Sequence, residues 1–284
     1  MRKKYNKPLE RKMKKYSFIF SALLSAVIFC GCGGNEEDFA KLMLKAKDSM
    51  AKGQVKEALT YSQKAQECQP NSPEAIVMTA LAYERNQKNP EALKEIQKAV
   101  KIAPKNYFVQ YTYGRLLYKN KKTDLSIVAL KEAVKLDPKK TEARELLARA
   151  ATEAKDYETA MQQYHALIND PSYKNKDVVY NEIGVYYYLV KKNYKQSSAY
   201  LNKALNANNK VQNPTILLNA AVLCEMRKFY GAAQVFYRKY LSATERDTSR
   251  AKKRAAVNTR LSGLSSKQPA RSRNRASGRT TRRR

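Results

Sequence analysis

Three prolines recur at a fixed interval in the middle of the chain. Pro70, Pro104 and Pro138 stand 34 residues apart. Alanines recur at constant offsets before them, namely Ala58 and Ala65, Ala92 and Ala99, and Ala133. A fixed period in the range of about 20–50 residues is typical of stacked supersecondary units. We therefore expect the chain to fold as an array of repeats.

Residues 73–106 form the most regular of these units. Apolar and small side chains recur there at helical spacing in two runs, separated by the polar residues 86–89. Pro90 suits the first turn of a second helix, and Pro104 ends it, because proline disfavours helix in the residue before it. The pattern predicts a helix, a tight turn and a helix, whose backbones approach closely at the small residues Ala80, Ala92 and Ala99.

This pattern resembles the tetratricopeptide repeat (TPR), a helical hairpin with small residues at fixed positions and a proline near its end. On this resemblance six repeats begin near residues 39, 73, 107, 141, 177 and 214 and cover 39–241. The turn of the fifth is one residue longer than usual, and Tyr240 stands at a usual small position of the sixth. The implied fold class is all-α, a TPR superhelical solenoid of about six helix-turn-helix repeats, with a disordered N-terminal leader and basic C-terminal tail.

In the TPR family, the first helices of the repeats line a concave groove that binds a partner. Tyrosine beside arginine suits an extended peptide, because the rings bury area and arginine pairs with a carboxylate. The alternative is a solvated face without a partner. The lysine and asparagine that chaperone-binding relatives use are not matched, because Met43 and Lys47 stand there. The matching groove positions are Tyr111, Arg115, Tyr118, Lys119, Arg149, Asn181 and Tyr188.

The first 31 residues have the organisation of an export signal. A basic start precedes the apolar run Ser17–Phe29, which is too short to span a bilayer comfortably. Gly31-Cys32 resembles the lipobox of bacterial lipoproteins, in which the cysteine is diacylated and becomes the mature N-terminus. A plain secreted protein and an uncleaved anchor are the alternatives, and translation could start at Met1 or Met13. The lipoprotein reading makes 1–31 a signal peptide and 32–38 a lipidated tether, and Gly33 implies the outer membrane, facing the periplasm.

Positive charge is concentrated at the C-terminal end. The chain carries a net charge of +31, of which residues 242–284 supply +12 with only two acids. This composition predicts a disordered basic tail. Such a tail suits an anionic surface such as lipopolysaccharide, acidic lipid or nucleic acid, and the alternative is a solvated tail without a ligand.

The sequence offers no catalytic constellation, cofactor motif or metal site. His165 is the only histidine, and the cysteines have no zinc-ribbon spacing. Cys68 and Cys224 fall in distant repeats, so we expect them to be unpaired packing residues. The chain is therefore expected not to be an enzyme and to have no small-molecule substrate.

Two functional hypotheses remain. The first is a membrane-tethered scaffold that docks a segment of a protein partner in a cell-envelope assembly. Its layout of leader, cysteine and about six repeats is similar to that of TPR lipoproteins of type IV pilus biogenesis. The second is a binder of anionic polymers or surfaces, in which the tail dominates.

Overall fold

The computed structural model describes residues 36–207 and 213–266, and every regular element in these ranges is a helix. The chain divides into two compact units, Met1–Leu136 and Asp137–Arg284. The predicted signal peptide and Cys32 lie outside the described residues, as do residues 267–284 of the predicted tail. No helix in the described part is long and apolar enough to cross a membrane.

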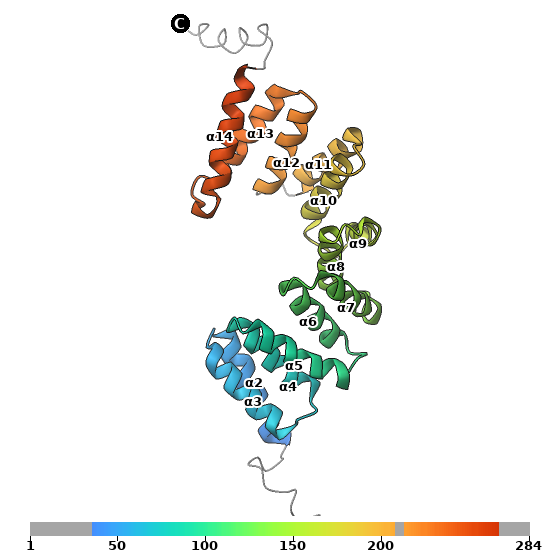
Figure 1. Cartoon of the computed structure of the whole chain (residues 1–284), viewed down its shortest axis with the longest axis vertical. Helices are drawn as coiled ribbons and strands as arrows, with labels where there is room; N and C mark the ends of the chain where they lie inside the picture. The colour runs from blue at the N-terminus through green and yellow to red at the C-terminus, as the bar shows by residue number, and fades with distance from the viewer. Residues whose placement is uncertain (1–35, 208–212, 267–284) are drawn as a thin grey trace, which may run out of the picture. The chain divides into compact units, whose positions relative to one another are not determined.

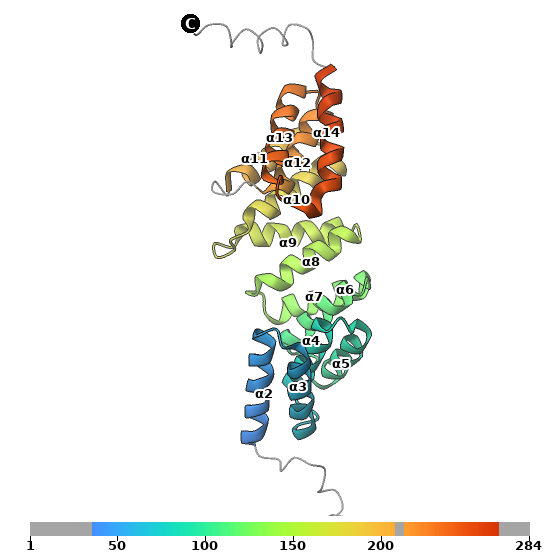
Figure 2. The ribbon, with the colours of Figure 1, turned by 90° about the vertical axis from the view of Figure 1, so that its left-hand side faces the viewer.

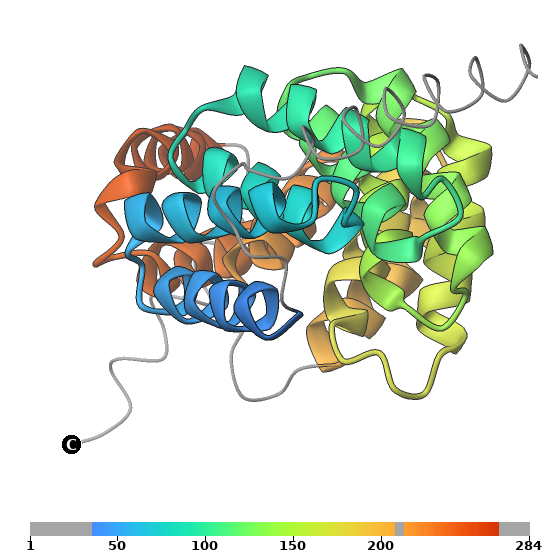
Figure 3. The ribbon, with the colours of Figure 1, turned by 90° about the horizontal axis from the view of Figure 1, so that it is seen from below.

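The first unit contains three helical hairpins (Figure 1). Each hairpin packs on the next, and the first helices of neighbouring hairpins also touch. The two helices of the first hairpin run beside each other, as the blue segments of Figure 3 show. The hairpins are α2 (Glu36–Ala51) with α3 (Val55–Cys68), α4 (Pro73–Arg85) with α5 (Asn89–Ile102), and α6 (Tyr107–Lys119) with α7 (Thr123–Leu136).

The second unit contains three further hairpins and a terminal helix. The hairpins are α8 (Thr141–Glu153) with α9 (Tyr157–Asn169), α10 (Lys176–Leu189) with α11 (Tyr194–Ala207), and α12 (Pro214–Met226) with α13 (Tyr230–Ala243). A short 3-10 turn, η1 (Thr248–Arg250), then leads into α14 (Ala251–Ser266), which packs on α13 (Figure 2). Six hairpins thus confirm the predicted all-α repeat fold.

Small side chains allow the helices of each hairpin to approach closely. Ala80, Ala92 and Ala99 are completely buried, as the sequence predicts for the second repeat. In the third repeat a Cβ added to Gly114 would lie 2.7 Å from Cγ of Leu130. These positions are part of the core and not of a binding site.

The turn inside each hairpin contains one residue in the left-handed region. Gly53 has φ +76°, and a non-glycine residue takes this place in the other five hairpins. Three residues separate the two helices in five hairpins, whereas four separate α10 from α11, which confirms the longer turn of the fifth repeat. The left-handed residues after the first hairpin are Gln87, Lys121, Lys155, Lys192 and Lys228.

The disorder predicted from residue 242 onward is wrong for the part that the structure describes. α14 buries Val257 and Leu264 in a cluster that also contains Tyr237 and Tyr240. The few apolar residues of this segment lie on one side of a helix and cover the end of the sixth hairpin. Composition alone did not indicate this, because α14 is polar on most of its surface.

Candidate protein-binding surface

In the first unit, α6 carries four of the predicted groove residues. Asn106 caps this helix by accepting hydrogen bonds from the backbone N–H groups of Phe108 and Val109. Because Phe108, Tyr111, Arg115 and Lys119 follow one another at intervals of three and four residues, they lie along one side of α6. The structure thus brings Tyr111, Arg115 and Lys119 together along this helix.

The N-terminal half of this side is aromatic. The rings of Tyr107 and Tyr111 are stacked, with centroids 5.9 Å apart and an interplanar angle of 3°. Phe108, whose sequence position also falls among the predicted groove positions of the third repeat, is 50% exposed. Large exposed aromatic side chains are typical of protein-binding surfaces. Tyr118, near the other end of α6, is half-buried.

The C-terminal half of this side is cationic but already neutralised within the unit. Arg115 donates from Nη1 and Nη2 to the two carboxylate oxygens of Glu84 on α4, at 2.8 and 2.7 Å. Lys119 Nζ lies 3.3 Å from Glu84 Oε1. Arg115 was predicted to pair with a carboxylate of the partner. In the structure, Arg115 meets a carboxylate of the neighbouring repeat, and its pairing with a partner stays a prediction.

In the second unit, Arg149 lies exposed on α8, and its charge acts on Tyr164 and Glu182. Burial raises the pKa of the Glu182 carboxyl, and the nearby Arg149 charge opposes this shift. Tyr173 Oη donates to Glu145 Oε2 at 3.2 Å, and burial raises the pKa of its hydroxyl. Arg149 therefore belongs to a polar network along the first helices of this unit.

Asn181 and Tyr188 are less accessible than the sequence predicts for groove residues. Asn181 is 2% exposed, accepts a hydrogen bond from Asn219 Nδ2 at 2.8 Å and donates to Glu182. Tyr188 is 7% exposed and packs against Leu201 and Leu223. Asn181 thus links the first helices of the fifth and sixth repeats, and Tyr188 belongs to the core.

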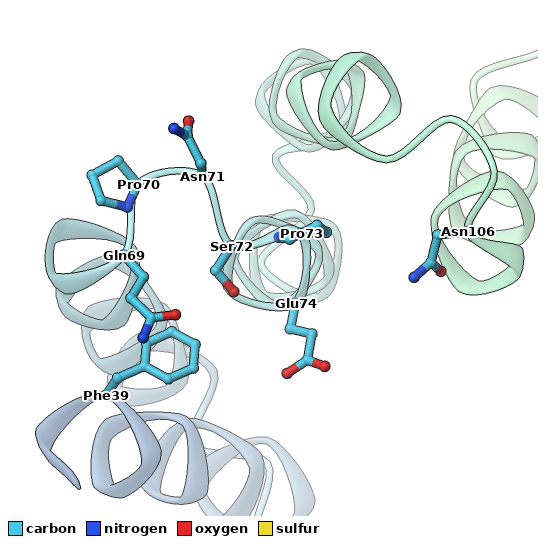
Figure 4. Close-up of a pocket in the computed structure, with 8 residues that line it drawn as sticks. All are labelled: Phe39, Gln69, Pro70, Asn71, Ser72, Pro73, Glu74 and Asn106. Atoms are coloured by element: carbon cyan, nitrogen blue, oxygen red, sulfur yellow. The ribbon is translucent and has the colours of Figure 1, made fainter. Parts of the chain in front are cut away.

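A hollow of about 560 Å³ lies at the N-terminal ends of α2, α4 and α6 (Figure 4). Phe39, Glu74 and Asn106 approach it from these three helices. Ser72 Oγ accepts from the backbone N–H of Ala75, so it acts as a helix cap, as does Asn106. Two polar side chains of this hollow, those of Ser72 and Asn106, are thus used for helix capping.

A second hollow of about 560 Å³ lies over α3, α4 and α5. Glu95 in this hollow accepts from Gln66 at 2.6 Å and from Lys98 at 2.8 Å. Its other polar pair joins Gln63 to the Tyr83 hydroxyl. These bonds hold neighbouring repeats together. Within the described residues, no group of three or more metal-ligating side chains comes together.

Three stacked helical hairpins in each unit, with small residues at their contacts, define a helical-repeat fold. Residues 111–174 match the family model of the tetratricopeptide repeat, and residues 51–133 match that of subunit 3 of the anaphase-promoting complex, or cyclosome. The chain therefore has the fold of a tetratricopeptide-repeat solenoid, and part of it matches that family's model. No curated protein matches the chain.

Solved structures with a similar fold include three that are covered over at least 94% of their own length. PilF of Pseudomonas aeruginosa has 20% identity and a TM-score of 0.62, covering 78% of this chain and 98% of its own. PilW, described as a widely conserved type IV pilus biogenesis factor, has 16% identity and a TM-score of 0.62, with coverages of 75% and 96%. YrrB, described as a TPR protein with an unusual peptide-binding site, has 22% identity and a TM-score of 0.54, with coverages of 69% and 94%. At these identities the similarity shows the fold.

Proposed function

We propose that this protein is a scaffold that binds a segment of a partner protein along the first helices of its repeats. The observation that carries the proposal is the aromatic surface of α6, where Phe108 is 50% exposed beside the stacked rings of Tyr107 and Tyr111. Such rings bury a large area at little conformational cost when a partner docks. The scaffold needs no catalytic residue and no cofactor to do this.

The surface of α6 suits an apolar or aromatic segment better than an acidic one. Glu84 holds Arg115 through two hydrogen bonds and approaches Lys119, so a partner carboxylate would have to compete with it. The half-exposed Phe108 ring offers an apolar side chain a surface on which to pack. Arg149 supplies a separate exposed cation in the second unit.

We further propose that the chain works at a bacterial cell envelope as a lipoprotein anchored through Cys32. The lipobox-like Gly31-Cys32 and the basic-then-apolar leader support this anchor. The fold is similar to those of PilF and PilW, and PilW is described as a type IV pilus biogenesis factor. This similarity is consistent with a role in a cell-envelope assembly. Mass spectrometry of the purified mature protein tests the anchor, which predicts an acylated N-terminal Cys32. An N-terminus at any other residue contradicts it.

A capture experiment tests the partner surface. The tagged full-length protein is compared with the double variant Phe108→Ala, Tyr111→Ala in pull-downs from solubilised envelopes. The control is Leu125→Ala, Val128→Ala on α7, which removes side chains of similar exposure outside the first helices. We expect the α6 variant to lose an envelope protein that the control retains. Equal capture by all three proteins would overturn the proposal.

The alternative function is binding of an anionic surface, and fewer basic residues are available for it than the sequence indicates. Arg254 donates to the backbone carbonyls of Thr244 and Asp247, and Arg250 pairs with Asp247 at 2.9 Å. These arginines help to fix α14 on the sixth hairpin. A tail-dominated function would therefore rest on residues 267–284 together with exposed cations such as Lys252 and Lys253, and removing both would abolish binding to lipopolysaccharide.

A further inference from the structure

Five tyrosines of the second unit form a continuous strip that the TPR groove does not include. Their ring centroids follow one another at 5.4 Å, 5.5 Å, 5.5 Å and 6.4 Å across α9, α10 and α11. On α10, Tyr180 and Tyr187 are seven residues apart and share one side of the helix, whereas Asn181 and Tyr188 occupy the adjacent side. In order, the tyrosine strip consists of Tyr157, Tyr186, Tyr187, Tyr200 and Tyr180.

The hydroxyl groups distinguish this strip from three other tyrosines of the unit. Tyr164, Tyr173 and Tyr237 all have hydroxyls hydrogen-bonded within the protein. Within the described residues, no hydroxyl of the strip has a hydrogen-bond partner, and none of them is among the buried polar atoms without one. The rings are half-buried. The strip therefore presents hydroxyls that are available to donate hydrogen bonds to a ligand.

Two lysines lie over the rings of the strip. Lys203 Nζ is 5.3 Å from the ring centroid of Tyr200 and 5.8 Å from that of Tyr180. Lys191 Nζ is 5.9 Å from the centroid of Tyr186. Both lysines are exposed, and neither has a carboxylate partner among the described residues. The strip thus combines hydroxyl donors with unpaired ammonium groups.

Around Tyr186, Tyr187 and Tyr200 the sequence lacks acidic residues, whereas Asp156 and Glu158 flank Tyr157. Between Glu182 and Glu225 there is no aspartate, glutamate or arginine, whereas five lysines occur. Because this stretch contains no acidic residue that could pair with the lysines, their charges can interact with a ligand. Complementary charge across an interface guides association and selects the partner.

The ring geometry decides which kind of anionic ligand fits. Tyr187 and Tyr200 are stacked at an interplanar angle of 9°, so each already uses a face on the other. Lys203 and Lys191 lie over three further faces. A sugar or a nucleic-acid base stacks on an aromatic face, and these contacts reduce the number of faces available. The hydroxyls and ammonium groups at the strip suit carboxylates.

We propose that the tyrosine strip is a docking surface for an acidic segment of a partner protein. Its carboxylates accept hydrogen bonds from the strip hydroxyls and pair with Lys191 and Lys203. Each lysine supplies a point charge and rotatable N–H donors for such a carboxylate. This surface is separate from the aromatic side of α6 and does not depend on it.

The test uses the full chain and a fluorescein-labelled peptide of alternating glutamate and glycine, with fluorescence anisotropy as the readout. The triple variant Tyr180→Phe, Tyr187→Phe, Tyr200→Phe keeps every ring and removes only hydroxyls that bond nothing in the protein. We expect it to raise the Kd about tenfold, the order lost with a hydrogen bond to a charged group. Lys203→Gln is expected to raise the Kd roughly threefold.

The chain offers a matched control in the first unit. Lys45 Nζ lies 5.6 Å from the ring centroid of Tyr61, outside any strip. Lys45→Gln and Tyr61→Phe are expected to leave the Kd unchanged, as is Phe108→Ala with Tyr111→Ala. Identical affinity of the strip variants and the wild type would overturn the proposal. So would tighter strip-dependent binding of inorganic polyphosphate than of the peptide, since it would identify a phosphate ligand.

Discussion

Arg115 on α6 and Glu84 on α4 form an ion pair with two parallel hydrogen bonds, of 2.8 and 2.7 Å, between neighbouring repeats. The Glu84 side chain is 9% exposed and that of Arg115 is 32% exposed. A nearly buried carboxylate is tolerated because a guanidinium matches its geometry. The pair therefore holds the second repeat in register with the third.

Removing the arginine should destabilise the first unit. Arg115→Met retains the apolar stem but leaves Glu84 with Lys119 alone, so we expect a loss of about 1–3 kcal/mol. In urea denaturation, a double-mutant cycle with Glu84→Gln should give a coupling energy of about 0.5–3 kcal/mol. The control is the exposed pair Lys41–Glu37, whose coupling should stay below about 0.5 kcal/mol. Equal coupling in the two cycles would contradict the structural role of Arg115.

Replacing each of three glycines by alanine should change the free energy of unfolding, in one direction at two of them and in the other direction at the third. A Cβ at Gly114 meets Leu130 Cγ at 2.7 Å, and one at Gly184 meets Leu201 Cγ at 2.9 Å. We expect each substitution to lower the free energy of unfolding by about 1–3 kcal/mol through overpacking. At Gly263 on α14 nothing lies within 4 Å, so alanine should stabilise by about 0.5–1 kcal/mol. Denaturation curves measure all three, and stabilisation by Gly114→Ala would refute the close approach of α6 and α7.

The repeat architecture could be predicted from the sequence because its signals are local. Pro73, Tyr107, Thr141 and Pro214 begin α4, α6, α8 and α12, at the positions where the period places repeat starts. Small residues and prolines specify these hairpins through contacts within one repeat or with the next one. Because these signals are local, the repeat period can be recognised in a single sequence without an alignment.

The candidate surface was harder to predict because it depends on contacts between repeats. Sequence position places Arg115 in a groove, but only the structure shows that Glu84, 31 residues earlier, pairs with it. The same holds for the Asn181–Asn219 contact and for the burial of Tyr188. α14 was missed for a related reason, since its composition is polar and its burial depends on two apolar residues that fit the end of α13.

Two buried tyrosines should make stability fall in alkaline solution. Burial raises the pKa of Tyr164 from 10.0 to about 12, and burial with its hydrogen bond to Glu225 raises the pKa of Tyr237 to about 12. Because the folded pKa values lie above the unfolded one, their contribution to stability is fully present below pH 10. It is lost as the pH rises through 12. The melting temperature should fall over this window.

The double variant Tyr164→Phe, Tyr237→Phe cannot ionise at these positions. Its melting temperature should fall less steeply between pH 10 and 12 than that of the wild type. Below pH 9 the difference between the two proteins should be constant. Parallel curves over the whole alkaline range would show that these hydroxyls titrate alike in the folded and unfolded chains.

The cap formed by α14 should control the stability of the sixth repeat. Leu264 is 1% exposed, and it packs in one cluster with Tyr237 and Tyr240. Leu264→Ala removes apolar contacts from this cluster and should cost about 2–5 kcal/mol of local stability. Hydrogen exchange should therefore accelerate in α13 and α14, whereas Ser262→Ala, an exposed change on the same helix, should leave it unaltered.

The set of helices in which Leu264→Ala accelerates hydrogen exchange shows how cooperatively the second unit unfolds. In stacked repeats each unit contacts only its neighbours, so the loss should decline from α13 toward α10 and should be absent in α8. Unchanged exchange in α13 would show that α14 does not cap the repeats. Equal acceleration from α8 to α14 would instead show that the second unit opens as one cooperative body, since only then can the loss of one terminal side chain reach its first helix.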